Sequence, residues 1–154
     1  MGRKMDKIQK LTINCIVLIS FSSAIFTDEL KDIIDSKKSS FEEIALDIWN
    51  YAELGYLETK SSNLLASELE ENGFIIQKGV AGIPTSFIAE FNNGGPVIGI
   101  LGEFDALPGL AQTNSPFKEV ADNETGAGHA CGHHLFGAAS AWAAVVIKEW
   151  IEEN

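Results

Sequence analysis

Cysteine is scarce in this sequence, and the positions of its two cysteines restrict the chemistry open to the chain. Among 154 residues only Cys15 and Cys131 carry a thiol, and Cys15 lies inside an uncharged N-terminal run, residues 11–26. If that run is removed as a leader, Cys131 remains alone and no intramolecular disulfide can form. A lone thiol in an exported chain calls for a chemical explanation.

Basic residues are also few, which excludes one class of partner. Lys and Arg together number 11 against 22 Asp and Glu, for a formal net charge of −11. Nucleic acid binding needs a basic face that neutralises phosphates, so we expect no nucleic acid partner. The acidic balance does not select a substrate, because it mainly affects solubility. The hydrophobic content of 45% supplies a core for about one domain.

The sequence has no long hydrophobic run. Residues 11–26 are uncharged but include Thr12 and Asn14, and they are fewer than the roughly 20 apolar residues that span a bilayer. This run follows the basic residues 1–10 and is typical of a secretory signal. We therefore predict a signal peptide or N-terminal anchor over residues 1–26, with cleavage near Ala24, and one domain over residues 27–154. Such a signal predicts export to a periplasmic or extracytoplasmic compartment, and its absence would predict a cytoplasmic protein.

Apolar periodicity and turn signals predict a layered α/β fold. Helices are predicted over residues 39–55, 58–73 and 135–151, the first from a capping box at Ser39 and Ser40 and the second from a closing Gly73. Strands are predicted over residues 74–80, 85–91 and 97–101. The last strand is almost continuously apolar, as in a strand covered on both faces. Residues 103–128 lack periodicity and predict a long loop.

The segment "GHACGHHLFGAA", residues 128–139, contains all three histidines of the chain. Cys131 and His133 are separated by Gly132, which permits a turn that brings thiol and imidazole to one cation. A thiolate suits zinc, and imidazole suits most divalent first-row metals. The spacing alone leaves three interpretations open, namely a metal site, a thiol nucleophile with a histidine base, and a glycine turn that only begins a helix.

Two carboxylates occupy a related position in the predicted fold. Glu103 and Asp105 follow the predicted strand, and the histidine and cysteine cluster precedes the last predicted helix. Ligand sites of open α/β sheets lie beyond the carboxyl ends of the strands. We therefore expect the carboxylates to converge on the cluster. The roles of Glu103, His129 and His134 stay open at this point.

Three stretches in this order, "AGIPTSFIAEF", "PVIGILGEFDALPGLAQ" and "GAGHACGHHLFGAA", resemble the M20 metallopeptidase family. Within it they are most similar to the amidohydrolase branch and its p-aminobenzoyl-glutamate hydrolase group. The similarity runs from about Phe41 to Trp150. It implies the N-terminal part of an M20 zinc-peptidase-like catalytic domain, an α/β fold with a mixed sheet flanked by helices. The family's dimerisation insert and C-terminal part would be absent.

The resemblance also implies an activity and a set of site residues. It implies metal-dependent hydrolysis of amide bonds in small acyl-amino acid or dipeptide substrates similar to aminobenzoyl-glutamate, with a pair of Mn or Zn ions that activates water. Cys131 and His133 match two metal ligands, and Asp105 matches the catalytic aspartate that orients a metal-binding histidine. Glu103 stands where other branches have a histidine ligand, and His134 stands where many relatives have Asp or Asn. Full-length relatives are expected to form homo- or hetero-oligomers.

The family's general base belongs to a Glu-Glu pair downstream of these motifs, and further ligands come later still. Glu152 and Glu153 are too close to Cys131 to match that pair. We therefore expect the 154 residues to be a fragment that is inactive alone and prone to aggregate. Two alternatives remain beside the enzyme: a truncated domain that binds a metal or a partner without turnover, and a cysteine-dependent hydrolase.

Overall fold

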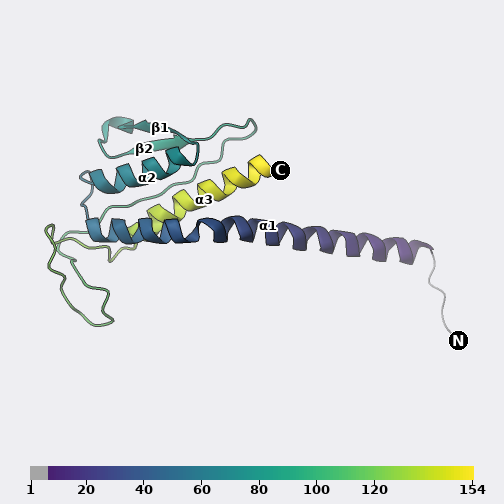
Figure 1. Ribbon diagram of the computed structural model, residues 1–154, viewed down its shortest axis with the longest axis horizontal. Coiled ribbons are helices and arrows are strands. Elements are labelled where there is room, and N and C mark those ends of the chain that lie inside the picture. Colours follow the sequence, from purple (N-terminus) through teal and green to yellow (C-terminus); the bar gives the residue numbers. More distant parts are fainter. Residues whose placement is uncertain (1–6) are drawn as a thin grey trace. The chain divides into compact units, whose positions relative to one another are not determined.

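The computed structural model describes the backbone of residues 7–154 and the side chains of residues 29–154 (Figure 1). The chain divides into two compact units, residues 1–36 and residues 37–154. The predicted leader belongs to the first unit, and residues 1–6 of it lie outside the described residues. No helix in the described part of the chain combines the length and the apolar character needed to span a membrane. The signal peptide or anchor over residues 1–26 and the export of the chain stay predictions.

Helix α1 (Lys7–Tyr51) contains the boundary between the units. The predicted helix start at Ser39 and Ser40 is wrong, because α1 continues through both residues. The Ser40 hydroxyl instead donates a hydrogen bond to the Glu68 carboxylate, at 3.5 Å. Residues 7–38 contain no Gly or Pro that would interrupt a helix, so a capping residue alone does not begin one here.

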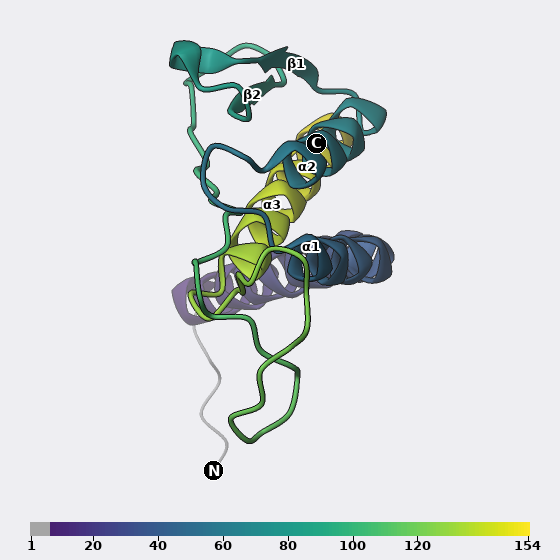
Figure 2. The ribbon, with the colours of Figure 1, turned by 90° about the vertical axis from the view of Figure 1, so that its left-hand side faces the viewer.

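The second unit contains the rest of the secondary structure (Figure 1, Figure 2). Helix α2 (Thr59–Glu71) precedes strands β1 (Ile75–Lys78) and β2 (Phe87–Glu90), with a short 3-10 helix η1 (Val80–Gly82) between the strands. The strands pair antiparallel, with Ile75 opposite Glu90 and Lys78 opposite Phe87. Helix α3 (His133–Glu153) completes the unit. A two-stranded sheet with helices agrees with part of an α/β fold.

Residues close in the sequence determine where α2 begins and ends. The Glu53 carboxylate accepts hydrogen bonds from the backbone N–H groups of Lys60 and Ser61, at 2.9 and 2.8 Å, so it satisfies donors of the first turn. Gly73 adopts φ 84° after the last turn, and the N–H of Phe74 bonds to the carbonyl of Leu69 at 3.0 Å. The predicted glycine stop at Gly73 is confirmed.

Apolar side chains from α1, α2 and α3 form the core of this unit. Phe41, Ile48, Leu65 and Val145 are almost completely buried, and the rings of Phe41 and Trp142 stack with centroids 6.0 Å apart. Each such side chain contributes about 1.5–3 kcal/mol of burial free energy. The core therefore joins the end of α1 to α3, which carries the histidine cluster at its start.

The predicted strand over residues 97–101 is wrong for the described structure. This segment forms no ladder with β1 or β2, and Val97 is 99% exposed and Ile98 is 74% exposed. A strand needs backbone partners on a neighbouring strand, and the described residues supply none. The predicted loop over residues 103–128 contains only isolated bridges, in agreement with the prediction.

Candidate functional site

Two glycines bring the segment that carries the carboxylates onto the first turns of α3. A Cβ atom on Gly137 would lie 3.0 Å from the Glu103 carbonyl oxygen and 3.0 Å from Phe104 Cβ. A Cβ atom on Gly102 would lie 3.1 Å from Ser140 Cβ. Such short distances require residues without side chains. The chain leading to Asp105 therefore packs directly on α3, close to where α3 begins.

Short backbone bridges fix the two segments that meet at the site. The N–H of Ala106 donates to the carbonyl of Glu53 at 2.7 Å, and Leu107 and Gly128 exchange two hydrogen bonds of 3.0 Å each. A Cβ atom on Gly128 would clash with the Leu110 carbonyl oxygen, so a larger residue would displace this bridge. Asp105 and the histidine cluster are thereby held beside each other, although they are far apart in the sequence.

His133 lies between two carboxylates. Its Nδ1 is 2.8 Å from Asp105 Oδ1, and its Nε2 is 3.1 Å from Glu103 Oε2. One ligand atom from each of the three residues lies within 4.8 Å of the other two. Nδ1 forms a hydrogen bond with Asp105, whose carboxylate oxygen only accepts, so Nδ1 carries a proton. Nε2 faces Glu103, and a divalent cation could bind between them.

Cys131 lies beside this group of three but does not belong to it. Its side chain is exposed, and its Sγ atom is 3.8 Å from the backbone oxygen of Asp105. The structure thus brings Asp105 and His133 together, with Cys131 next to Asp105. The assignment of Cys131 and His133 as metal ligands, and of Asp105 as catalytic, stays a prediction. Sequence reasoning left Glu103 open, although its position two residues before Asp105 was the available signal.

The other two histidines do not belong to this group of three. The buried His129 donates a hydrogen bond from Nε2 to the Ile48 carbonyl oxygen at 3.0 Å. The His134 ring lies 5.1 Å from the His129 ring and meets the Trp49 ring edge-on at 5.0 Å. Burial lowers the pKa of both histidines below 6.5, because desolvation disfavours the charged form. Neither ring belongs to the group of possible metal ligands.

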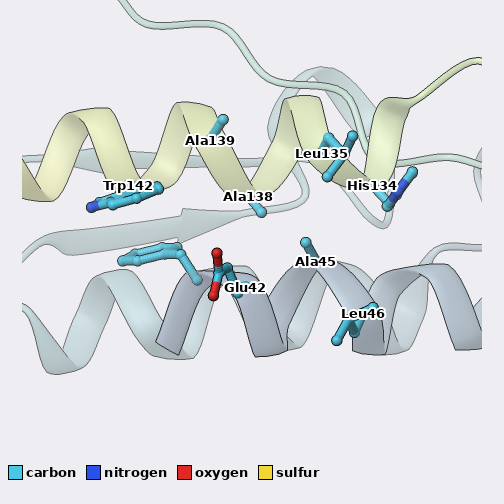
Figure 3. A pocket seen from close by; sticks show the side chains of 9 residues that line it. Glu42, Ala45, Leu46, His134, Leu135, Ala138, Ala139 and Trp142 are labelled. Atoms are coloured by element: carbon cyan, nitrogen blue, oxygen red, sulfur yellow. The ribbon is translucent and has the colours of Figure 1, made fainter. Parts of the chain in front are cut away.

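An apolar groove of about 400 Å³ lies between α1 and α3. Figure 3 shows His134 at one end of the groove and Trp142 toward the other. Glu103, Asp105 and His133 do not line it. At the far end of α3, Glu152 accepts a hydrogen bond from Lys148 at 2.7 Å, so this exposed glutamate pairs within its own helix.

No family model matches the sequence. The chain is 40% identical over 124 residues to a p-aminobenzoyl-glutamate hydrolase subunit of Escherichia coli (strain K12), and the match covers 80% of this chain and 26% of that protein. It is 34% identical over 105 residues to N-acetylcysteine deacetylase of Bacillus subtilis (strain 168), covering 67% of this chain and 27% of the relative. The chain belongs to the M20 family. The M20 resemblance noted from the motifs is therefore confirmed.

A third relative is also named as a hydrolase. Hippurate hydrolase of Campylobacter jejuni is 31% identical over 104 residues, covering 68% of this chain and 26% of that protein. The chain spans about a quarter of the length of these curated relatives. These relatives are named as two hydrolases and a deacetylase.

Proposed function

We propose that this chain is part of a metal-dependent amidohydrolase that cleaves amide bonds of small acyl-amino acid or dipeptide substrates similar to p-aminobenzoyl-glutamate. The observation that carries the proposal is the convergence of Glu103, Asp105 and His133, whose ligand atoms lie within 4.8 Å of one another. The names of the M20 relatives supply the reaction class and the substrate class.

The donor set fits a divalent cation. Carboxylate oxygens and an imidazole nitrogen suit Mn and Zn, and the nearby thiol of Cys131 would favour Zn. We assign Cys131 and His133 as ligands, with Glu103 as a further oxygen donor beside them, in a complete site that holds a pair of ions. When bound, such ions polarise the substrate carbonyl and lower the pKa of water.

Asp105 has a distinct task in this proposal. Its carboxylate accepts a hydrogen bond from Nδ1 of His133 at 2.8 Å, which fixes the ring orientation and leaves Nε2 for a cation. Such a carboxylate–histidine pair raises the basicity of the ligating nitrogen. Glu103 faces the same Nε2 at 3.1 Å, so it lies where a cation held by that nitrogen would also meet a carboxylate.

A second candidate is a domain that binds metal or a partner protein without turnover. The observation that favours it is that the three-residue group is partly exposed, with 52% of the Glu103 side chain open to solvent, so it is not a closed site. The Escherichia coli relative is named as a subunit, and we propose that this chain likewise functions in an oligomer.

Metal binding and hydrolysis of the full chain distinguish the two candidates. We expect the wild type to bind Zn²⁺ or Mn²⁺ in calorimetry, and Cys131→Ser and His133→Ala to bind about tenfold or more weakly. Glu42→Gln is the matched control, because Glu42 lies on α1 outside the three-residue group. Hydrolysis of p-aminobenzoyl-glutamate that EDTA abolishes and metal restores supports the amidohydrolase. Metal binding without hydrolysis supports the second candidate, and unchanged binding in both ligand variants refutes the assignment.

A further inference from the structure

The cysteine and histidine of the candidate site are presented by one tight turn. The N–H of Gly132 donates to the carbonyl of His129 at 3.0 Å, which closes a four-residue turn with Cys131 at its third position. Gly132 then adopts φ 81° and begins α3, and the N–H groups of Leu135 and Phe136 bond to its carbonyl. The direction of Cys131 and His133 therefore follows from how this turn is anchored.

The side chain of His129 is the deepest anchor of the turn. His129 is only 2% exposed, and its Nε2 lies 3.0 Å from the carbonyl oxygen of Ile48. A carbonyl only accepts, so Nε2 carries a proton, and Nδ1 has no hydrogen-bond partner among the described residues. Ile48 is fully buried, and its carbonyl also accepts the N–H of Ala52 at 3.1 Å. The ring thus ties the turn to the last turn of α1.

Other contacts of the turn lie at its two ends. Gly128, before the turn, pairs with Leu107, and Gly132, after it, belongs to the start of α3. Cys131 is exposed, and its Sγ atom lies 3.8 Å from the Asp105 backbone oxygen. Among these contacts, the His129 side chain is the one that fixes the turn from its interior side.

We propose that His129 is a positioning residue, whose hydrogen bond from Nε2 to Ile48 holds the turn so that Cys131 and His133 face Asp105 and Glu103. This inference rests on the proposed metal site, because it explains how the ligands of that site are presented. It gives the buried His129 a task without making it a ligand. It also links the end of α1 to the metal site.

The test separates the two nitrogens of the His129 ring in the full chain. In His129→Gln the amide nitrogen reaches the place of Nε2 and can still donate to Ile48, whereas in His129→Asn it reaches only the place of Nδ1. His129→Phe keeps an aromatic ring at this position and removes both nitrogens. His134→Phe is the matched control, since it changes the neighbouring ring and leaves the bond to Ile48 intact.

Two readouts are measured at a temperature where circular dichroism shows every variant folded. The first is Co²⁺ affinity, followed by the thiolate-to-cobalt absorption that reports Cys131. The second is amide hydrogen exchange of residues 128–136 in metal-free protein. We expect His129→Phe and His129→Asn to weaken Co²⁺ binding about tenfold or more and to speed exchange in the turn. His129→Gln and His134→Phe should stay within about twofold of wild type, well inside that loss.

The outcomes distinguish this inference from the proposed function. Wild-type affinity and wild-type exchange in His129→Phe and His129→Asn would overturn the positioning role. Equal loss in Gln and Asn variants would also overturn it, because the Nε2 bond would then not matter. If the wild type binds no Co²⁺, the proposed metal site fails, and hydrogen exchange alone decides the role of His129. Faster exchange in His129→Asn but not in His129→Gln then supports the positioning role, and equal exchange rates in the two variants refute it. If His129→Phe does not fold, the Gln and Asn pair gives the answer.

Discussion

At the residue scale, the three histidines differ because of their surroundings rather than their spacing. His133 is partly exposed and lies between Asp105 and Glu103, at 2.8 and 3.1 Å. His129 and His134 face Trp49 and the core instead, with ring contacts of 6.3 and 5.0 Å to its indole. Carboxylates favour a cation at His133, and burial favours neutral rings at the other two. One short motif therefore supplies one candidate ligand and two structural side chains.

His129 and His134 predict that acid destabilises the protein. Burial is the largest cause of the lowered pKa of both rings, and for His129 the bond to Ile48 and the charge of Asp105 oppose it while His133 adds to it. The nearby charge of His129 lowers the pKa of His134 further. In the unfolded chain a histidine takes up its proton near pH 6.5, but the folded rings take it up only at lower pH. Between these values the unfolded state binds more protons, so stability falls as the pH falls below about 6.5.

Urea unfolding of the full chain at pH 7.5 and pH 5.5 checks this expectation. The wild type should lose stability at the lower pH, and a variant with both His129→Phe and His134→Phe should lose less. An equal loss in the two proteins would show that other groups cause the acid sensitivity.

At the element scale, local signals predicted helices better than strands. The apolar pattern around Leu65 and Leu69 and the stop at Gly73 predicted α2, because both depend on neighbours within the helix. The strand over residues 97–101 was predicted from its almost continuous apolar run, but pairing depends on residues distant in the sequence. The approach of Glu103 and Asp105 to the histidine motif could be expected from the topology. The 3.1 Å distance between Glu103 and His133 could not, because it depends on the packing of Gly137.

We expect position 137 not to tolerate even the methyl side chain of alanine. Gly→Ala within a helix ordinarily stabilises by about 0.5–1 kcal/mol, but here the added methyl would meet Glu103 O and Phe104 Cβ at 3.0 Å. We expect Gly137→Ala to destabilise by about 1–3 kcal/mol, as overpacking does, and to weaken metal binding by moving Glu103. Chemical denaturation and calorimetry measure the two effects.

The control variant Ala143→Gly, at an exposed position of α3, measures the helix propensity alone. A more stable Gly137→Ala with wild-type metal affinity would contradict the close packing.

At the scale of the whole molecule, the unit of residues 37–154 exposes several large apolar side chains. Val97 is 99% exposed, Phe117 is 81% exposed and Val120 is 74% exposed. Apolar surface of this kind favours association, and the backbone of residues 97–101, which forms no ladder with β1 or β2, offers a template for pairing with another strand. The sequence-based expectation of aggregation has this physical basis and stays a prediction.

Association of the chain should depend on Val97 more than on charge. We expect Val97→Glu to raise the protein concentration at which sedimentation velocity first shows oligomers. Gln112→Glu adds the same charge at another exposed position and should leave that concentration unchanged. If both variants shift it equally, the added charge explains the effect and the segment of residues 97–101 is not the contact.

The N-terminal segment predicts the cellular compartment of the protein. The basic residues 1–10 and the uncharged run of residues 11–26 have the order of a secretory signal, and we propose that they export the chain with cleavage near Ala24. Leu18→Arg places a charge in the middle of the apolar run, and it should leave the chain uncleaved in the cytoplasm. Leu46→Arg adds the same charge at a position that is 62% exposed and should not affect export. Cell fractionation and N-terminal sequencing measure both results. A wild-type chain that stays in the cytoplasm with Met1 or Gly2 at its start would refute the signal and would place the lone thiol of Cys131 in a reducing compartment.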